Sequence, residues 1–305
     1  MTETAQIERA CPVCQNAAAQ PHWRKGDLQI VRCADCSMVF VNPAPTAMAS
    51  GQFYDTEGAD YYLSPAKLAS DYAVVRFERE LRLLRKFCPH GAVLDVGCGS
   101  GGFLFQLKQR WPGDYEILGT DVSGGPLDYA ESRGVPVARG NFLELNFKNA
   151  PFDAVTFWAV AEHLAEPGRF LEKACALLKP GGLCFVLVPN LRSLAVRWLG
   201  AKYRYVYPQH LNYFSASTLA RLGARTGFAV VAMQFTHFNP VVLWQDWRGR
   251  GRDVSNAERG ELLKQTTALK QKPWLQPVKW LYGLTEKALG VMGLADNLVV
   301  VFRKK

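Results

Sequence analysis

Residues 93–102 read Val-Leu-Asp-Val-Gly-Cys-Gly-Ser-Gly-Gly, a short apolar run that ends in an acid and then enters a cluster of glycines. With the apolar stretch Phe103–Lys108 behind it, this segment predicts a strand, a tight turn and a helix. A glycine-rich turn of this kind lets backbone approach a nucleotide-like ligand closely. Asp95 stands at the end of the predicted strand, so we expect its carboxylate to face the ligand or the turn.

The glycine turn has two competing interpretations, besides a purely structural turn. The first is a dinucleotide site: Gly97, Gly99 and Gly102 satisfy that fingerprint, and Asp121 follows the last of them by 19 residues. A carboxylate near the turn gives no benefit to the phosphates of a dinucleotide.

The second interpretation uses a different glycine trio. Gly97, Gly99 and Gly101, with Asp95 two residues earlier, resemble the first motif of class I S-adenosylmethionine-dependent methyltransferases. A carboxylate favours a cationic methionine moiety, so Asp95 supports this interpretation.

Two Cys-x-x-Cys pairs lie near the N-terminus, Cys11–Cys14 and Cys33–Cys36, with 18 residues between them. This spacing predicts a structural zinc ribbon, in which two tight turns offer four thiolates in a tetrahedron. A redox pair would need only one such motif. Four thiolate ligands close the coordination sphere, so we expect the metal to be structural.

Strand-like stretches, Leu28–Arg32 and Met38–Val41, flank the second pair of cysteines. His22 lies between the two pairs, where a further ligand is not needed, and we expect it on the surface.

Composition sets broad limits on the protein. The chain has 305 residues, of which 49% are hydrophobic, enough for one large core with appended parts. No apolar run is long enough to span a bilayer, and Met1–Arg9 lacks the apolar core of a signal peptide. Several of the eight cysteines fall where disulfides would be awkward. We therefore expect a cytoplasmic protein.

The net charge of +9 is unevenly distributed. Residues 1–187 hold 18 Lys and Arg against 21 Asp and Glu, whereas residues 188–305 hold 18 against 6. The interval 188–239 contains no acidic residue. The basic half suits an anionic partner, such as a nucleotide sugar, a phospholipid-linked glycan, a membrane surface or RNA. An ordinary solvated basic surface is the alternative.

A helical period over residues 67–87 is expected to cover the ligand pocket, and strands and helices alternate after it. Strands are predicted at Ala92–Val96, Ile117–Asp121, Val135–Ala138, Phe152–Trp158, Leu183–Val188, Phe228–Phe235 and Asn297–Phe302, and helices at Pro126–Arg133, Gly168–Leu178 and Ser217–Thr226. Apolar strands alternating with helices are typical of a parallel sheet covered on both faces.

Residues 239–296 separate the last two predicted strands. We expect one helix near Asn256–Lys270 and a second, apolar helix from Trp274 to Met292. A helical pair packed on the domain is the commoner arrangement for such apolar stripes. Tryptophan and basic residues beside an apolar face also suit an interfacial or acyl-binding lid.

Four further motifs follow the glycine turn in order: Gly119–Ser123, Gly140–Phe142, Phe152–Leu164 and Leu178–Leu183. Together they resemble the class I methyltransferase family over residues 91–238 and 297–305. The resemblance implies an α/β fold, a Rossmann-like sheet of seven strands whose last strand is antiparallel. To this we add an N-terminal zinc ribbon and a helical insertion before the last strand.

The ribbon, Val188–Asn190 and Pro208–Ser215 resemble more narrowly a bacterial subgroup of small-molecule methyltransferases. That subgroup modifies sugars, lipid-linked glycans or secondary metabolites. One departure is Ala159, where the family often has an acid. The expected domains are a zinc ribbon (1–42), a linker and N-terminal helix covering the cofactor pocket (43–90), the methyltransferase core (91–238), a helical insertion serving as lid or acceptor-binding element (239–296) and the last core strand (297–305).

The resemblance implies S-adenosylmethionine as cofactor beside a structural Zn²⁺. An acid at Asp121 can accept hydrogen bonds from ribose hydroxyls, and the Asn141 amide and Phe142 ring could read and stack on adenine. The implied cofactor-binding residues are Asp95, Gly97, Cys98, Gly99, Gly101, Phe103, Asp121, Val122, Asn141, Phe142 and Trp158.

Methyl transfer from a sulfonium needs alignment above all, because the leaving thioether takes no proton. An oxygen or carbon acceptor must still lose a proton, so a base is useful. His210 is the first candidate for that base, and Tyr213 could orient the acceptor or share the proton. His163 is the second candidate. Helix capping by His210, or a structural hydrogen bond by His163, would explain these residues equally well.

We therefore predict a methyltransferase for a small acceptor, anionic or lipid-linked, with contact to the inner membrane through residues 239–296 as an option. An RNA methyltransferase is the alternative, although the basic half has no RNA-binding motif and an Asn-Pro-Pro-aromatic signature is absent. A non-catalytic binding module on the same fold is a third hypothesis, and intact Asp95 and Asp121 argue against it.

Overall fold

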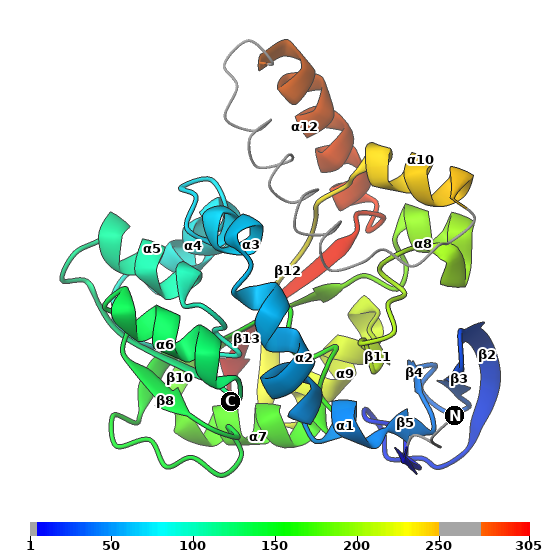
Figure 1. The fold of residues 1–305 in the computed structure, drawn as a ribbon, viewed down its shortest axis with the longest axis horizontal. Helices are drawn as coiled ribbons and strands as arrows, with labels where there is room; N and C mark the ends of the chain where they lie inside the picture. The colour runs from blue at the N-terminus through cyan, green and yellow to red at the C-terminus, as the bar shows by residue number, and fades with distance from the viewer. Residues whose placement is uncertain (1–4, 250–275) are drawn as a thin grey trace.

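A sheet of seven strands forms the centre of the computed structural model, which describes residues 5–249 and 276–305 (Figure 1). The strand order is β12-β13-β10-β9-β6-β7-β8. The strands are β6 (Gly91–Val96), β7 (Tyr115–Asp121), β8 (Val137–Arg139), β9 (Phe152–Trp158), β10 (Leu178–Pro189), β12 (Phe228–Thr236) and β13 (Asn297–Lys304).

Strands β8, β7, β6, β9 and β10 pair in parallel, whereas β13 lies antiparallel between β10 and β12. All seven predicted strands are confirmed, with differences only at their ends. The antiparallel last strand is confirmed as well, and with it the predicted fold class.

Helices cover both faces of the sheet, because consecutive strand residues point to opposite sides. Val93 packs into a cluster with α4 (Glu78–Phe87) and α5 (Gly102–Arg110). The next residue, Leu94, belongs to a cluster with α7 (Pro167–Leu177) and α9 (Ala216–Arg225). Helix α6 (Gly124–Ser132) follows β7 and adds Ala130 to the α4–α5 side.

The single helix predicted over residues 67–87 is wrong. The structure has α3 (Pro65–Asp71) and α4, with an irregular segment between them. Side chains of α5 bond the carbonyls of that segment: Gln106 Nε2 donates to Asp71 and Ala73 at 3.0 and 2.9 Å, and Arg110 donates to Val74 at 2.5 Å. The helical period is interrupted because these tertiary bonds take the carbonyls that a continuous helix would use.

The N-terminal cysteines belong to a small sheet in the order β11-β4-β3-β2. Three strands are local: β2 (Ala19–Lys25), β3 (Leu28–Cys33) and β4 (Val39–Val41). The fourth, β11 (Asn212–Tyr213), comes from the segment after β10 and pairs antiparallel with β4. A strand of the core segment thus completes the ribbon's sheet, an arrangement absent from our sequence predictions. A two-stranded pair, β1 (Gln6–Ile7) with β5 (Ala44–Pro45), lies beside it.

Between β12 and β13 the structure describes α10 (Pro240–Arg248) and α12 (Gln276–Val291). The helix predicted at 256–270 and the start of the second helix at Trp274 lie outside the described residues. An ion pair between Arg79 of α4 and Glu286 joins α12 to the core. Within the described residues, no helix is both long and apolar enough to cross a membrane.

Candidate functional site

The glycine turn after β6 is held to the end of β7 by one carboxylate. Asp121 Oδ2 accepts a hydrogen bond from the backbone N–H of Gly99 at 2.9 Å, and Oδ1 accepts one from Ser123 at 3.0 Å. Burial raises the pKa of Asp121 despite these bonds. The acid predicted to contact a ribose therefore also positions the turn.

The turn requires glycine at Gly97 for two reasons. Its φ is +73°, in the left-handed region, and a Cβ there would lie 2.5 Å from Val160 Cγ2. Val160 follows β9, so the absence of a side chain lets the turn after β6 close against the end of the neighbouring strand.

A cavity of about 270 Å³ opens at the carboxyl ends of β6, β7 and β9, the usual edge for ligands in open α/β sheets. Gly97, Asp121, Val122, Asn141, Phe142 and His163, all predicted site residues, line it. On one wall Phe142 stacks on Phe170, with ring centroids 5.5 Å apart and 27° between the planes. Asn141 accepts from Leu143 N and donates to Glu144.

Two short helices supply the outer wall of the cavity: α1 (Thr46–Ala49) and α2 (Gln52–Tyr62). Figure 1 shows α2 in front of the sheet edge, and Asp55 on it accepts a bond from Gly124 N of α6 at 3.2 Å. Met48, Tyr54 and Tyr62 from these helices line the cavity. Segment 43–90 thus contributes lining residues to the cavity, through helices that the sequence did not predict.

His163 lines the cavity next to a cluster of polar groups. Its Nδ1 lies 2.7 Å from the Tyr54 hydroxyl and donates to the Gln209 carbonyl at 3.0 Å. Its Nε2 lies 3.9 Å from Glu162 Oε1. The rings of His163 and His210 are 4.8 Å apart, edge to face. A cavity-lining imidazole is thus held by a tyrosine, a carbonyl and a second histidine.

Glu162 is the member of this cluster that sequence reasoning missed. Its side chain is 2% exposed, and burial raises its pKa to about 8. The pair Glu162–His163 directly after β9 was the available signal, because acids and histidines at strand ends cluster at functional sites. Tyr54 was also missed, since an aromatic in an apparent loop has no distinctive spacing.

The other proposed catalytic residues lie behind the cavity wall. His210 is 8% exposed, and its Nδ1 donates to the Tyr205 carbonyl at 3.0 Å. Tyr213, in β11, donates its hydroxyl to the Tyr207 carbonyl at 3.2 Å. The ring of His210 contacts that of His163, which lines the cavity.

Asp95 is 3% exposed and lies opposite Thr156 of the neighbouring strand β9. Thr156 Oγ1 of β9 donates to Asp95 Oδ1 at 2.6 Å, and burial raises the pKa of Asp95 to about 7. Phe103 packs against Trp158, with ring centroids 5.3 Å apart. The remaining predicted residues, Cys98, Gly99 and Gly101, form the turn itself.

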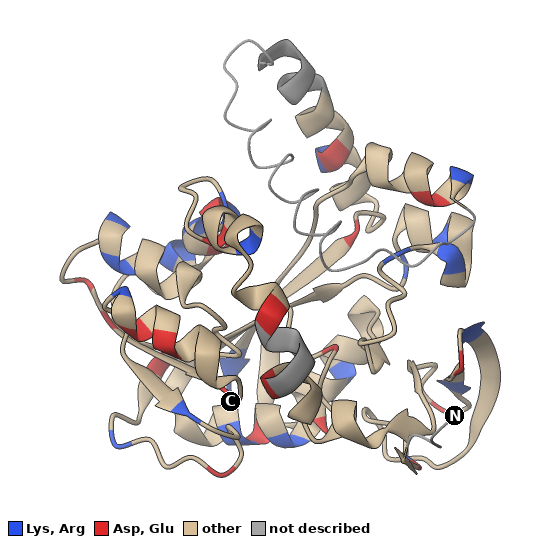
Figure 2. Ribbon diagram, viewed as in Figure 1, with Lys and Arg blue, Asp and Glu red and all other residues tan. Residues whose placement is uncertain are grey.

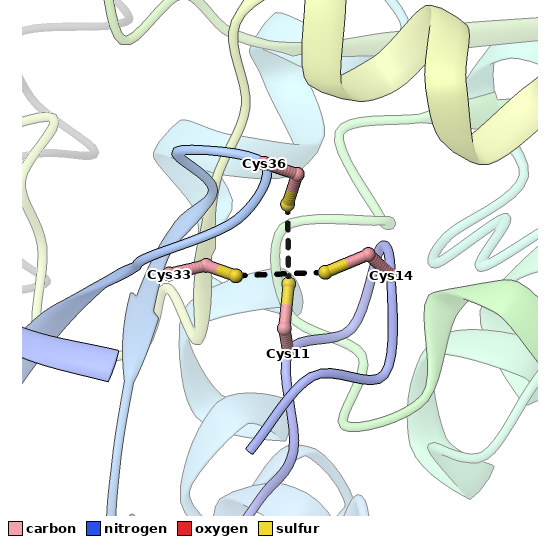
Figure 3. Close-up of side chains that lie close together, drawn as sticks. All are labelled: Cys11, Cys14, Cys33 and Cys36. Carbon is pink, nitrogen blue, oxygen red and sulfur yellow. Dashed lines mark hydrogen bonds between the residues drawn. The ribbon is translucent and has the colours of Figure 1, made fainter. Parts of the chain in front are cut away.

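The four N-terminal cysteines gather their thiols at one point (Figure 3). Cys11 Sγ lies 3.4 Å from Cys36 Sγ, and Cys14 Sγ lies 3.5 Å from Cys33 Sγ. Four sulfurs at about 2.3 Å from a tetrahedral zinc lie roughly 3.8 Å apart, close to these spacings.

Both cysteine turns have the same backbone form. Gln15 and Ser37 directly follow the second cysteine of each pair. Both have left-handed backbone, with φ of 64° and 62°. Each donates its N–H to the carbonyl of the first cysteine. The two turns therefore present their cysteine pairs with the same backbone geometry.

Comparison with known proteins gives a consistent picture. A family model described as a methyltransferase domain matches residues 70–233. A ubiquinone biosynthesis O-methyltransferase of Caulobacter vibrioides is 30% identical over 212 residues, covering 64% of this chain and 77% of the relative. One of Dinoroseobacter shibae is 31% identical over 180 residues, covering 53% and 69%.

Solved structures share the fold. A methyltransferase of Thermotoga maritima, described as a possible histamine N-methyltransferase, is 18% identical with a TM-score of 0.53, covering 85% of this chain and 100% of the other. The 1,6-didemethyltoxoflavin-N1-methyltransferase of Burkholderia thailandensis is 16% identical with a TM-score of 0.52, covering 94% and 100%.

Proposed function

The chain belongs to the S-adenosylmethionine-dependent methyltransferase family, and on that premise we propose that it methylates a small-molecule acceptor bound beside His163. The observation that carries this proposal is one continuous cavity that Asp121, Phe142 and His163 all line. The residues proposed to bind the methyl donor and the base proposed for the acceptor therefore line the same cavity.

The residues around the glycine turn fit the cofactor. Asp121 keeps acceptor capacity for ribose hydroxyls, because a carboxylate offers about four lone-pair sites and two are used by backbone. Phe142 offers an apolar wall for a purine ring. When bound, S-adenosylmethionine supplies a methyl group on a positively charged sulfur. We assign Gly97, Asp121, Val122, Asn141 and Phe142 to its binding.

The other predicted cofactor-binding residues are proposed to act on the cofactor site less directly. They are Asp95, Cys98, Gly99, Gly101, Phe103 and Trp158. The backbone N–H of Gly99 donates a hydrogen bond to Asp121, and Phe103 and Trp158 pack against each other. Asp95 and Thr156 together keep a buried polar pair at the base of the turn.

We propose that His163 receives the proton that an acceptor hydroxyl or carbon acid gives up. Its ring is held at Nδ1 by Tyr54 and the Gln209 carbonyl. A protonated ring would lie 3.9 Å from Glu162 Oε1, and its positive charge would favour ionisation of this buried carboxyl. His210 is proposed to support this ring from behind. Tyr213 is proposed to keep the segment 207–213 in place through its bond to Tyr207.

The class of acceptor follows from charge and from relatives. The curated relatives carry the name ubiquinone biosynthesis O-methyltransferase, which supports a small acceptor. The basic balance of residues 188–305 supports an anionic or lipid-linked one. For the same reason we propose contact with a membrane through the region 239–296, which carries its own helices beside the core.

A methyl-transfer assay tests the proposal. The protein is incubated with methyl-labelled S-adenosylmethionine and, separately, with the small-molecule, lipid and RNA fractions of a bacterial extract. Label in the small-molecule or lipid fraction supports the proposal. Label confined to RNA contradicts it.

Variants then assign the base. His163→Asn should lower the rate by about 10²–10⁴-fold, the usual contribution of a general base, with cofactor binding retained. His90→Asn is the matched control, since His90 is exposed at the start of β6, far along the strand from the cavity. If the methyl-transfer rate falls in His210→Asn and not in His163→Asn, the base is His210 instead.

We further propose that Cys11, Cys14, Cys33 and Cys36 hold a structural Zn²⁺. The converging thiols and the matching backbone of the two cysteine turns support it. Val13 and Met38, beside the cysteines, pack in the same core cluster as α7 and α9. The ion would therefore stabilise the ribbon against the core and take no part in methyl transfer.

A further inference from the structure

The outward face of α10 carries large exposed apolar side chains. Val242 and Leu243 point inward, into a cluster with Ala195 and Leu289, so the helix is already anchored. On the opposite side Val241, Trp244 and Trp247 are 55%, 52% and 54% exposed. A helix on an ordinary solvated surface carries polar residues on this side. Packing among residues 5–249 and 276–305 does not explain the exposed tryptophans.

A second helix extends this face. Trp198 of α8 (Leu194–Leu199) is 61% exposed, and its ring lies 6.2 Å from that of Trp247. We call Trp198, Val241, Trp244 and Trp247 the tryptophan surface. Its members come from segments more than forty residues apart, which the fold brings together (Figure 1).

Within the described residues, the exposed charged side chains on or beside α8 and α10 are basic. Arg192, Arg197, Lys202 and Arg248 are exposed on or beside α8 and α10, and Figure 2 shows basic segments on both helices. Arg248 lies over the Trp244 ring, 4.7 Å from its centroid. The acid of α10, Asp246, is buried and bonded to Arg204. Exposed tryptophans with a basic rim are the composition of proteins that lie at an anionic membrane surface.

The tryptophan surface and the cavity lie at the same edge of the sheet. Helix α8 follows β10, and α10 follows β12, a strand parallel to β10, because β13 runs antiparallel to both. The cavity lies at the corresponding ends of β6, β7 and β9. A molecule held at a membrane by this surface would turn its cavity edge toward the lipid.

We propose that the tryptophan surface docks on an anionic phospholipid bilayer, with the rings in the interface and the arginines on the lipid phosphates. The inference deepens the proposed function, on which it rests for a lipid-linked acceptor. The membrane contact proposed above for residues 239–296 as a whole is thereby narrowed to a defined surface, which also includes α8.

Vesicle co-sedimentation tests the proposal with the full-length protein. We expect binding to vesicles of phosphatidylcholine containing phosphatidylglycerol, weakened by salt, and much weaker binding to phosphatidylcholine alone. Binding to neither vesicle at low salt would overturn the proposal. Binding of an RNA oligonucleotide without vesicle binding would also overturn it, and would assign the basic face to nucleic acid.

Two variants locate the contact. W198A/W244A/W247A and R197E/R248E should each lower vesicle partitioning by at least about tenfold. R82E/K148E is the matched charge control, because Arg82 and Lys148 are exposed on other parts of the surface, and it should bind like the wild type. Vesicle binding unchanged in both variants would overturn the assignment.

S-adenosylmethionine titration of the same variants keeps the two proposals apart. Normal cofactor affinity shows that a variant is folded, so loss of vesicle binding then reports on the surface alone. If the wild type itself does not bind S-adenosylmethionine, the result counts against the proposed function.

Discussion

The backbone N–H of Gly99 donates to Asp121 Oδ2 at 2.9 Å, which ties the turn after β6 to the end of β7. Two strands that are neighbours in the sheet thus share one carboxylate at the point where the cofactor is expected. Substitutions that disturb either side of this bond should therefore act on cofactor affinity before they act on the fold.

Gly97→Ala should abolish measurable S-adenosylmethionine binding. The new Cβ would lie 2.5 Å from Val160 Cγ2 at a φ of +73°, so the turn must shift. Gly113→Ala is the control: its φ is +85°, but nothing lies within 4 Å, so it carries only the conformational cost of about 1–2 kcal/mol. Calorimetry on both variants checks this, and equal affinities in the two would refute the role of close approach.

Thr156→Val should destabilise the protein by about 1–3 kcal/mol, because it removes the donor to the buried Asp95 carboxylate. Thr120→Val is a matched control, since the buried Thr120 hydroxyl has no hydrogen-bond partner among the described residues. Its loss should be neutral or slightly stabilising. Urea unfolding of the two variants makes the comparison, and a similar cost for both would show that the Asp95–Thr156 bond is not special.

The protein without cofactor should lose stability as pH rises from about 5 to 8. Burial raises the pKa of Glu162 to about 8, against about 4.3 in an unfolded chain, so the folded state holds a proton that the unfolded state releases. Glu162→Gln removes this pH-dependent loss of stability. It should raise the melting temperature at pH 8 by roughly 2–4 °C, with little change at pH 5. A rise of the same size at both pH values would mean that Glu162 ionises normally.

Cys11→Ser should lower zinc content and thermal stability together, because one of four ligands is lost. Cys175→Ser is the control: its thiol lies on α7, outside the four-cysteine cluster, and should leave zinc unchanged. Elemental analysis and thermal unfolding measure both effects. A Cys11→Ser protein that is stable and free of metal would contradict a structural ion.

Local sequence patterns were enough to predict the central sheet. Most of the parallel strands are short apolar runs between a glycine or proline turn and a helix, so their positions depend on neighbours in the chain. The same holds for the two cysteine turns, whose residues are all local.

What could not be predicted depends on contacts between distant segments. The break between α3 and α4 arises because Gln106 and Arg110, more than thirty residues later, bond the carbonyls of the intervening segment. Strand β11 belongs to the ribbon's sheet only because Asn212 and Tyr213 meet β4 in space. The cavity wall formed by α2 likewise requires the contact of Tyr54 with His163.

The central claim is that the cavity beside Asp121 binds S-adenosylmethionine, and calorimetric titration of that compound tests it most directly. We predict binding by the wild type and by Asp128→Ala, a control whose carboxylate is 74% exposed on α6, and at least about 100-fold weaker binding by Asp121→Ala. Binding of NAD without affinity for S-adenosylmethionine, or equal affinity in the two variants, would contradict it.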